Sequence, residues 1–493
     1  MQLALSQITY TYPSAVEPLF TSLSVTFPQG WTALLGDNGC GKTTLARIAC
    51  GELVPDSGSI TGGLFSVLCT QETAIPPEAL YDFATSYDRE ARELREIFSL
   101  EDDMPWRYGE LSCGEQKKLQ VATALWQRPD VLVLDEPTNH IDHDARIQLA
   151  RALKRFRSIG ILVSHDRELI DELVERCVSF EAGGLVVRRG GYTAAHAQAE
   201  HERATVMRER AAAKDELARL SVERDRRAHE AARADARRSK RHIDPKDKSA
   251  KAKIDLAVYS GQDGARGRLA AQMDSQLAAA QERLNAAFVH KRYDGDLWIE
   301  TNPSPRKTLL RIPEATMPCG PGTLELPELY VGNTDHIGIV GPNGAGKSTF
   351  LAHVRGILAE HAADLSVLDI PQELSPADTE QLFARIKGLS SAERGRVLST
   401  VAQLNSDPDR ILEGGRTSPG EARKLMLATG ILDEPVLIIM DEPTNHLDLH
   451  STQALERALA AYPGALLLVS HDRAFLAACT TATWTVRNGR LHA

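Results

Sequence analysis

Two glycine-rich octapeptides are the strongest chemical signal in this sequence of 493 residues. Residues 36–43 read Gly-Asp-Asn-Gly-Cys-Gly-Lys-Thr, and residues 341–348 read Gly-Pro-Asn-Gly-Ala-Gly-Lys-Ser. Each follows a short apolar run and precedes helix-like sequence, the context of a phosphate-binding loop. Glycines at this spacing let backbone N–H groups close around phosphates, to which Lys42 and Lys347 add positive charge. A glycine-rich turn with a chance lysine is the alternative, but the full pattern occurs twice.

The loops predict a nucleotide with Mg²⁺ as the ligand. The hydroxyl groups of Thr43 and Ser348 are the expected Mg²⁺ ligands. Both octapeptides, with the residue that follows each, are assigned to the nucleotide: Gly36, Asp37, Asn38, Gly39, Cys40, Gly41, Lys42, Thr43 and Thr44 in the first copy, and Gly341, Pro342, Asn343, Gly344, Ala345, Gly346, Lys347, Ser348 and Thr349 in the second.

A pair of carboxylates follows an apolar run in each half of the chain. Asp135-Glu136 and Asp441-Glu442 both continue into Pro-Thr-Asn-His. The runs are typical of buried parallel strands, whose carboxyl ends carry the ligand sites of open α/β sheets. We expect the aspartates to hold Mg²⁺, directly or through water, and the glutamates to polarise the attacking water as general bases.

A histidine ends a further apolar run in each half. His165 and His471 both lie in Val-Ser-His-Asp-Arg. One histidine at a strand end is more often structural, but the two have the same place in a repeated pattern. They are therefore candidates to contact the terminal phosphate.

The three motifs recur at a nearly constant offset. The two lysines of the loops are 305 residues apart, and the paired aspartates and histidines are each 306 apart. Such spacing indicates a duplicated domain. We therefore expect an α/β protein with two P-loop NTPase domains, over residues 1–192 and 293–493.

Residues 193–292, between the two copies, differ in composition. They are rich in Ala, Arg, Glu and Gln, and residues 200–231 read as a long polar helix. Pro245 is a plausible break and residues 269–288 a return helix, so the segment is expected to form a helical hairpin. Its tip is basic. It is either a solvated spacer or an RNA contact made by Arg237, Arg238, Lys240, Arg241, Lys246, Lys248, Lys251 and Lys253.

Composition excludes several classes of protein. The net charge is −10, which argues against a uniformly basic nucleic-acid-binding surface. The apolar runs are far shorter than the roughly 20 residues that span a bilayer. No secretory signal is visible at the start, and the seven cysteines form no Cys-x-x-Cys pair. We expect a cytoplasmic protein with reduced thiols and no membrane domain in the chain.

Together these motifs resemble those of a known family, the ATP-binding cassette (ABC) proteins with two nucleotide-binding domains. Residues 111–115 (Leu-Ser-Cys-Gly-Glu) and 417–421 (Thr-Ser-Pro-Gly-Glu) resemble its signature motif, with which one domain contacts the nucleotide held by the other. Cys113 replaces the usual glycine there. The resemblance implies ATP contacts by Ser112, Gly114, Ser418 and Gly420, and Q-loop roles for Gln71 and Gln372.

The same resemblance assigns an aromatic residue to the adenine. Tyr12, thirty residues before Lys42, is similar to the aromatic that stacks on the base, and Tyr10 is a weaker choice. No aromatic residue before Lys347 fits that role convincingly. The nucleotide affinity of the second half therefore stays open.

More narrowly, the chain resembles the ABC-F subfamily. Both halves contain Glu-Pro-Thr-Asn-His-(Ile/Leu)-Asp, and a charged helical linker joins them. The resemblance implies an ATPase that binds the ribosome (rRNA and tRNA), with its linker near the tRNA and the peptidyl-transferase centre. It fits both a translation factor and a ribosome-protection resistance protein.

The resemblance also implies a monomer whose cassettes pair head to tail around two ATP molecules. The first site would combine Lys42, Thr43, Gln71, Asp135, Glu136 and His165 with Ser418 and Gly420. The second would combine Lys347, Ser348, Gln372, Asp441, Glu442 and His471 with Ser112 and Gly114. The alternatives are a tandem ATPase subunit of a membrane ABC transporter, a DNA-repair ATPase, and a binding module with degenerate sites.

Overall fold

The computed structural model describes residues 1–139, 141–181, 184–238, 262–286, 297–320, 322–362, 364–406, 408, 418–445 and 447–493. The chain divides into two compact units. Met1–Ala195 and Arg292–Ala493 together form one unit, which contains both halves of the repeat, and His196–Lys291 form the other.

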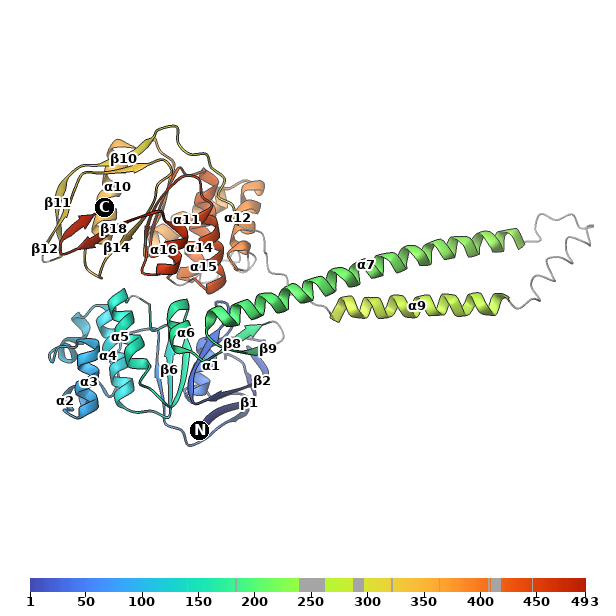
Figure 1. Cartoon of the computed structure of the whole chain (residues 1–493), viewed down its shortest axis with the longest axis horizontal. Helices are drawn as coiled ribbons and strands as arrows, with labels where there is room; N and C mark the ends of the chain where they lie inside the picture. Colours follow the sequence, from blue (N-terminus) through green and yellow to red (C-terminus); the bar gives the residue numbers. More distant parts are fainter. Residues whose placement is uncertain are drawn as a thin grey trace, which may run out of the picture. The chain divides into compact units, whose positions relative to one another are not determined.

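Each half of the repeat alternates strands and helices around a mostly parallel sheet (Figure 1). The first half contains β1 (Gln2–Tyr10), β2 (Phe20–Pro28), β3 (Gly30–Leu35), α1 (Lys42–Ala49), β4 (Ser57–Ile60), β5 (Ser66–Cys69), α2 (Leu80–Thr85), α3 (Arg89–Phe98), a 3₁₀ helix (Met104–Glu110), α4 (Cys113–Trp126), β6 (Val131–Asp135), α5 (His143–Leu153), β7 (Ile159–Val163), α6 (Arg167–Leu173), β8 (Arg176–Glu181) and β9 (Gly184–Arg189).

The second half follows a similar order, but among the described residues it has two more strands before its glycine-rich loop and none that corresponds to β4 after it. It contains β10 (Thr308–Ile312), β11 (Ala315–Cys319), β12 (Gly322–Leu326), β13 (Leu329–Gly332), β14 (His336–Val340), α10 (Lys347–His361), β15 (Val367–Ile370), α11 (Pro376–Gly388), α12 (Ser391–Gln403), α14 (Pro419–Gly430), a 3₁₀ helix (Ile431–Asp433), β16 (Leu437–Asp441), α15 (Leu449–Ala460), β17 (Ala465–Val469), α16 (Arg473–Cys479), β18 (Ala482–Arg487) and β19 (Arg490–His492).

The two main sheets share one strand order. The first is β5-β6-β7-β3-β8-β9, and the second contains the matching series β15-β16-β17-β14-β18. In both, the strand before the glycine-rich loop lies between the strand before the histidine and one further parallel strand. The glycine-rich loop, the carboxylate pair and the histidine therefore follow neighbouring parallel strands at one edge of each sheet.

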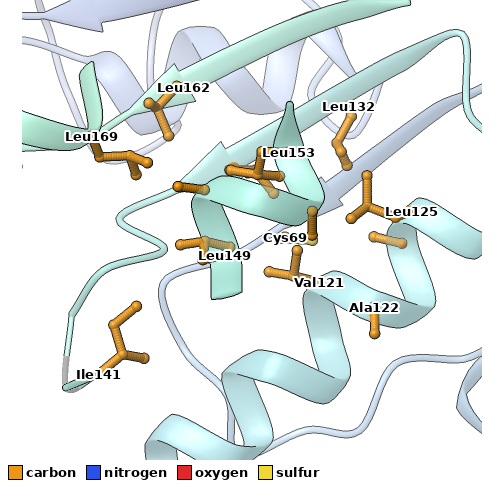
Figure 2. Close-up of a cluster of buried hydrophobic side chains, with 14 of the residues drawn as sticks. Cys69, Val121, Ala122, Leu125, Leu132, Ile141, Leu149, Leu153, Leu162 and Leu169 are labelled. Atoms are coloured by element: carbon orange, nitrogen blue, oxygen red, sulfur yellow. The ribbon is translucent and has the colours of Figure 1, made fainter. Parts of the chain in front are cut away.

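Continuous apolar strands hold these edges in place. Every residue of β6 and β16 is buried, as expected for parallel strands covered on both faces. Figure 2 shows Leu132 of β6 in one cluster with Val121 and Leu125 of α4 and Leu149 and Leu153 of α5. Burying these side chains fixes the strand ends that carry the polar residues.

A long helical segment joins the two halves. Helix α7 (Tyr192–Arg238) has 47 residues, about 70 Å at 1.5 Å per residue, and α9 (Gln262–Ala286) lies alongside it (Figure 1). Arg283 Nη1 of α9 lies 2.9 Å from Glu216 Oε2 of α7. The helix bounds are wider than residues 200–231 for the first helix and shifted relative to 269–288 for the second. Pro245 and the predicted basic residues from Lys240 to Lys253 lie outside the described residues.

Candidate nucleotide-binding and catalytic sites

A glycine in the left-handed backbone conformation precedes the helix that follows each glycine-rich loop. Gly41 (φ 101°) and Gly346 (φ 105°) lead into α1 and α10, so neither helix start has a side-chain cap. The first N–H groups of these helices thus remain available to an anion. A Cβ at Gly41 would lie 2.5 Å from Phe20 Cζ, and one at Gly346 would lie 2.8 Å from Cys319 Sγ. Only glycine fits this backbone at either position.

The two loop lysines are buried, and the ammonium group of each is hydrogen-bonded to its own loop. Lys42 Nζ donates to the carbonyl oxygens of Gly36 (2.8 Å) and Asp37 (3.0 Å). Lys347 Nζ makes the same two bonds, at the same distances, to the first two residues of its loop. Each ammonium group is therefore held where the phosphates of a nucleotide would contact the loop.

A hydroxyl and a carboxylate meet behind each loop. Thr43 Oγ1 donates to Asp135 Oδ2 at 2.7 Å, and Ser348 Oγ donates to Asp441 Oδ2 at 3.1 Å. These hard oxygen donors suit Mg²⁺, which keeps several waters and needs few protein ligands. No group of three or more His, Cys, Asp or Glu residues that could hold a metal exists among the described residues. Each hydroxyl–carboxylate pair therefore suits a Mg²⁺ ion that keeps several water ligands, and not a metal bound entirely by protein side chains.

The two glutamates adopt an unusual backbone conformation. Glu136 (φ 46°) and Glu442 (φ 48°) both have positive φ, which is uncommon for non-glycine residues and clusters at active sites. Their N–H groups donate to the carbonyl oxygens of Val163 (2.8 Å) and Val469 (2.9 Å) on the neighbouring strand. Burial raises the pKa of each glutamate to about 8, although the nearby loop lysine lowers it.

Each histidine contacts the glutamate of its own half. His471 N donates to Glu442 Oε2 at 3.3 Å, and His471 Nε2 lies 3.1 Å from Asn343 Oδ1 and 3.3 Å from Lys347 Nζ. Burial, and then the positive charge of Lys347, lower the pKa of His471 to about 4. His165 contacts Glu136 in the same way, with Nε2 3.2 Å from Oε1. Burial and Lys42 lower its pKa as well, so both rings are neutral near pH 7.

The signature serines cap helices. Ser112 and Ser418 are the N-cap residues of α4 and α14, and each forms a reciprocal capping box with Glu115 or Glu421. The Ser112 and Ser418 hydroxyls donate to those carboxylates at 2.7 and 2.9 Å. The caps fix where each helix begins, and hence the direction of its N-terminal N–H groups.

One cavity of about 640 Å³ collects the residues predicted for the second site. Its lining comes from both halves of the repeat. It includes Ser112 and Gly114 from the first half, and Lys347, Ser348, Gln372, Asp441, Glu442 and His471 from the second.

The first predicted site is not gathered in the same way. Glu136 and His165 line the cavity. The other predicted residues are outside its lining: Lys42, Thr43, Gln71, Asp135, Ser418 and Gly420. Gln71 is exposed, and its carbonyl oxygen accepts a 3.2 Å hydrogen bond from Lys117 Nζ.

Tyr12 lies beside the first loop. Its hydroxyl is 2.7 Å from Thr44 Oγ1, and 39% of the residue is exposed. Tyr10, the weaker choice for the base contact, is buried and meets the Tyr12 ring edge-on, with centroids 5.2 Å apart. Tyr12 therefore offers a ring face that Tyr10 does not.

Sequence analysis missed several contacts between the two halves. Asn343 N–H donates to Asp142 Oδ2 at 3.2 Å, and Arg167 Nη2 lies 2.5 Å from Glu456 Oε2. Asp142 ends the Glu-Pro-Thr-Asn-His-Ile-Asp motif, so its place in the motif was visible. Its contact with the other loop was not.

The similarities to known proteins decide the family. A family model described as "ABC transporter" matches the chain twice, over residues 20–139 and 325–445. The ribosome protection protein VmlR of Bacillus subtilis (strain 168) is 30% identical over 97% of this chain and 86% of its own length. The chain belongs to the ABC-F subfamily of ATP-binding cassette proteins.

Other similarities agree with this ABC-F assignment. The tylosin resistance ATP-binding protein TlrC of Streptomyces fradiae is 30% identical, with coverage of 99% of this chain and 98% of TlrC. A crystal structure of archaeal ribosome recycling factor aABCE1, in complex with ribosomal stalk protein aP1, matches with a TM-score of 0.62 at 19% identity. It covers 98% of this chain and 89% of that chain. At that identity the match supports the fold alone.

Membership of ABC-F confirms three predictions made from the sequence: the family, the pair of P-loop NTPase domains joined by a helical segment, and the ATPase activity. Across the described residues, no helix has the length and apolar character required to cross a bilayer.

Proposed function

We propose that this ABC-F protein binds the ribosome and uses ATP-driven closure of its cassettes to position the α7–α9 linker near tRNA and the peptidyl-transferase centre. The observation that carries the proposal is the similarity to VmlR, which spans 97% of this chain and so includes the linker as well as the cassettes. The proposal covers a translation factor and a ribosome-protection resistance protein alike.

The second site supports a mechanism for ATP hydrolysis. The N–H groups of the glycine-rich loop and Lys347 would bind the phosphates, while Ser348 and Asp441 would hold Mg²⁺. Mg²⁺ would neutralise charge that develops on the transferred phosphoryl group. Glu442 Oε1 is buried beside the cavity and accepts no hydrogen bond from the described residues. It is therefore placed to accept a proton from the attacking water.

The remaining side chains of this site would orient the reactants. Neutral His471, between Glu442 and Lys347, can hydrogen-bond to the terminal phosphate without adding positive charge. Ser112 and Gly114 would bind the same nucleotide from the other cassette. We propose that Gln372 contacts the attacking water and Mg²⁺. The matching residues of the first site would have the same roles as those of the second: Lys42, Thr43, Gln71, Asp135, Glu136 and His165.

Contact between the two cassettes would couple ATP binding and hydrolysis to their closing and reopening. A nucleotide that binds the loop of one cassette and the signature of the other favours the closed arrangement. Hydrolysis and phosphate release remove that advantage, so the cassettes reopen. The linker emerges from the first cassette at Tyr192, whose hydroxyl accepts a 2.8 Å hydrogen bond from Gln453 Nε2 of the second. Closure is thus coupled to the base of α7.

We further propose that the basic residues predicted at the tip of the linker bind rRNA and tRNA phosphates. Of these, Arg237 and Arg238 end α7, and Lys240, Arg241, Lys246, Lys248, Lys251 and Lys253 lie outside the described residues. Each phosphate that they neutralise would release counterions, so the binding should weaken steeply as salt rises.

Ribosome co-sedimentation tests the proposal. A Glu136→Gln, Glu442→Gln double variant should bind ATP without hydrolysing it and should sediment with 70S particles in ATP but not in ADP. A matched Lys42→Ala, Lys347→Ala variant, with weakened ATP binding, should stay in the supernatant. The proposal is wrong if the glutamine variant binds ATP yet remains free of ribosomes with both nucleotides. Association with membranes would instead favour the transporter-subunit alternative.

A further inference from the structure

Two loops occupy matching positions in the cassettes but present different side chains. Tyr12 follows β1 and Cys319 ends β11, and the next strand in each cassette leads towards the strand before the glycine-rich loop. Tyr12 OH lies 2.7 Å from Thr44 Oγ1, and Cys319 Sγ lies 3.9 Å from Thr349 Oγ1. Both threonines are the second residue after the loop lysine. Cys319 of the second cassette therefore lies near the threonine that is equivalent to the one Tyr12 contacts in the first.

The two side chains offer a nucleotide base different surfaces. Tyr12 is 39% exposed and is braced edge-on by Tyr10, so one aromatic face is rigidly presented. Cys319 is half-buried, has its sulfur 3.9 Å from the Gly344 carbonyl oxygen, and is followed by Gly320. A thiol and a glycine provide no π-face on which a base could stack.

Among the described residues, no other aromatic side chain replaces the missing ring. The described residues lining the cavity of the second site include Cys319, Gly320 and Thr349, but no Phe, Tyr or Trp. Phe350 and Trp484, whose ring centroids are 5.9 Å apart, pack in the buried core of the second cassette. In the part of the chain that the structure describes, the cavity thus has a full set of phosphate-binding groups and no aromatic partner for a base.

We infer that the second site binds Mg²⁺–nucleoside triphosphates almost entirely through the triphosphate, with the base lying unstacked against Cys319 and Gly320. Stacking of a base on an aromatic side chain accounts for roughly 5- to 150-fold in affinity. The first site has this contribution through Tyr12 and the second does not. The two sites therefore differ in how far they depend on the base. This inference rests on the ATPase activity of the family and is independent of the ribosome.

Competition with inorganic tripolyphosphate, which lacks a base, tests the difference. Lys42→Ala protein keeps the second loop intact and Lys347→Ala protein keeps the first. In each, a non-hydrolysable ATP analogue is displaced by tripolyphosphate with Mg²⁺ present. At the second site, tripolyphosphate should bind within about threefold of the analogue. At the first it should bind roughly 5- to 150-fold more weakly. Equal ratios at the two sites overturn the inference.

Substitutions at the base positions give a matched comparison. Tyr12→Ala should weaken analogue binding at the first site by roughly 5- to 150-fold, whereas Cys319→Ala should change the second site less than about twofold. A loss above about fivefold in Cys319→Ala protein contradicts the inference. The competition in the preceding test needs no substitution at residue 319, so it decides the matter even if this variant is poorly folded.

Alkylation of Cys319 tests where the base lies. In the Lys42→Ala protein, peptide mass spectrometry would measure its maleimide labelling without ligand, with the ATP analogue and with tripolyphosphate. The analogue should slow labelling at least about fivefold, because the base covers the thiol, and tripolyphosphate should leave it nearly unchanged. Equal protection by both ligands, or protection by neither at saturation, rejects the placement of the base. Cys113, which lines the same cavity from the first cassette, reports access to the cavity as a whole.

Discussion

Glu136 and Glu442 combine backbone strain with a burial that favours their neutral form. Each has positive φ at the end of a buried strand, and burial raises the pKa of each to about 8. A general base works only when ionised, so we expect the ATPase rate to rise with pH from about 6, to be half-maximal at about 8 and to level off above about 9. The neighbouring histidines have lowered pKa values and should not contribute to this rise. Steady-state kcat measured against pH checks it, and a flat profile contradicts it.

The same pKa values predict a pH-dependent stability of the nucleotide-free protein. A carboxyl group with a raised pKa binds more protons in the folded than in the unfolded state. Its contribution to stability is therefore complete below about pH 4.5 and is lost as pH rises through about 8. Between these values each glutamate lowers the unfolding free energy by up to about 1.4 kcal/mol per pH unit. Thermal unfolding should show a shallower decline in Glu136→Gln, Glu442→Gln protein. Parallel curves for the two proteins count against the prediction.

The candidate site residues could be predicted from the sequence because they form contiguous runs, and their roles stay predictions. Each motif can be recognised from a few neighbouring residues: the glycine-rich loop, the Asp-Glu pair, and the histidine after an apolar strand. The repeat then shows which motif of the first half corresponds to which motif of the second. The contacts of Asp142 and Cys319 were not visible. Each depends on which side chain of a loop approaches a distant segment, and sequence spacing contains no such information.

At the scale of elements, a buried ion pair ties α14 to the start of α15. Lys424 Nζ lies 3.3 Å from Asp448 Oδ2, with side chains only 3% and 1% exposed. Burial raises the pKa of Asp448, but Lys424 and hydrogen bonds from Ser451 lower it below its usual value. Lys424→Ala would leave a buried, unpaired carboxylate and should cost about 3–5 kcal/mol of stability. The matched Lys118→Ala variant, at a partly exposed position of α4, should cost under about 1 kcal/mol. Denaturant unfolding measures both, and similar losses in the two variants refute the argument.

The pairing of α7 with α9 gives the second element-scale prediction. Ala280 on α9 is fully buried, whereas the adjacent Ala279 is exposed. Ala280→Glu would place a charge at the helix contact and should weaken it by about 1–3 kcal/mol, while Ala279→Glu should be nearly neutral. Hydrogen exchange of the α9 amides measures the difference. The ATPase rate should be unchanged in both variants, and unaltered exchange in Ala280→Glu protein contradicts the predicted contact.

Element type was easier to predict than element bounds. The apolar runs correctly indicated buried strands, because strands covered on both faces need unbroken apolar sequence. The polar linker predicted a helix, but not where it starts. Helix α7 begins at Tyr192, where the ring is buried against the first cassette and its hydroxyl bonds to Gln453. That start depends on tertiary contacts and not on helix propensity.

At the scale of the whole molecule, the polar contacts between the cassettes are candidates to set the strength of closure. Arg167 and Glu456, 17% and 22% exposed, form an ion pair between the cassettes. A contact present only in the closed state lets a nucleotide that binds this state bind more tightly. The affinity for ATP should therefore depend on this ion pair as well as on the groups assigned to the phosphates and Mg²⁺.

Arg167→Ala should lower the apparent affinity for a non-hydrolysable ATP analogue by roughly 5- to 20-fold, since an ion pair with limited exposure contributes about 1–2 kcal/mol. Glu456→Ala should do the same, and the double variant should be no weaker than either single variant, because the shared interaction is already lost. Arg306→Ala removes an exposed ion pair with Asp364 inside one cassette and serves as the control. Equilibrium binding of the analogue measures all four proteins. Additive losses in the double variant would mean that the two side chains act separately, which contradicts the prediction.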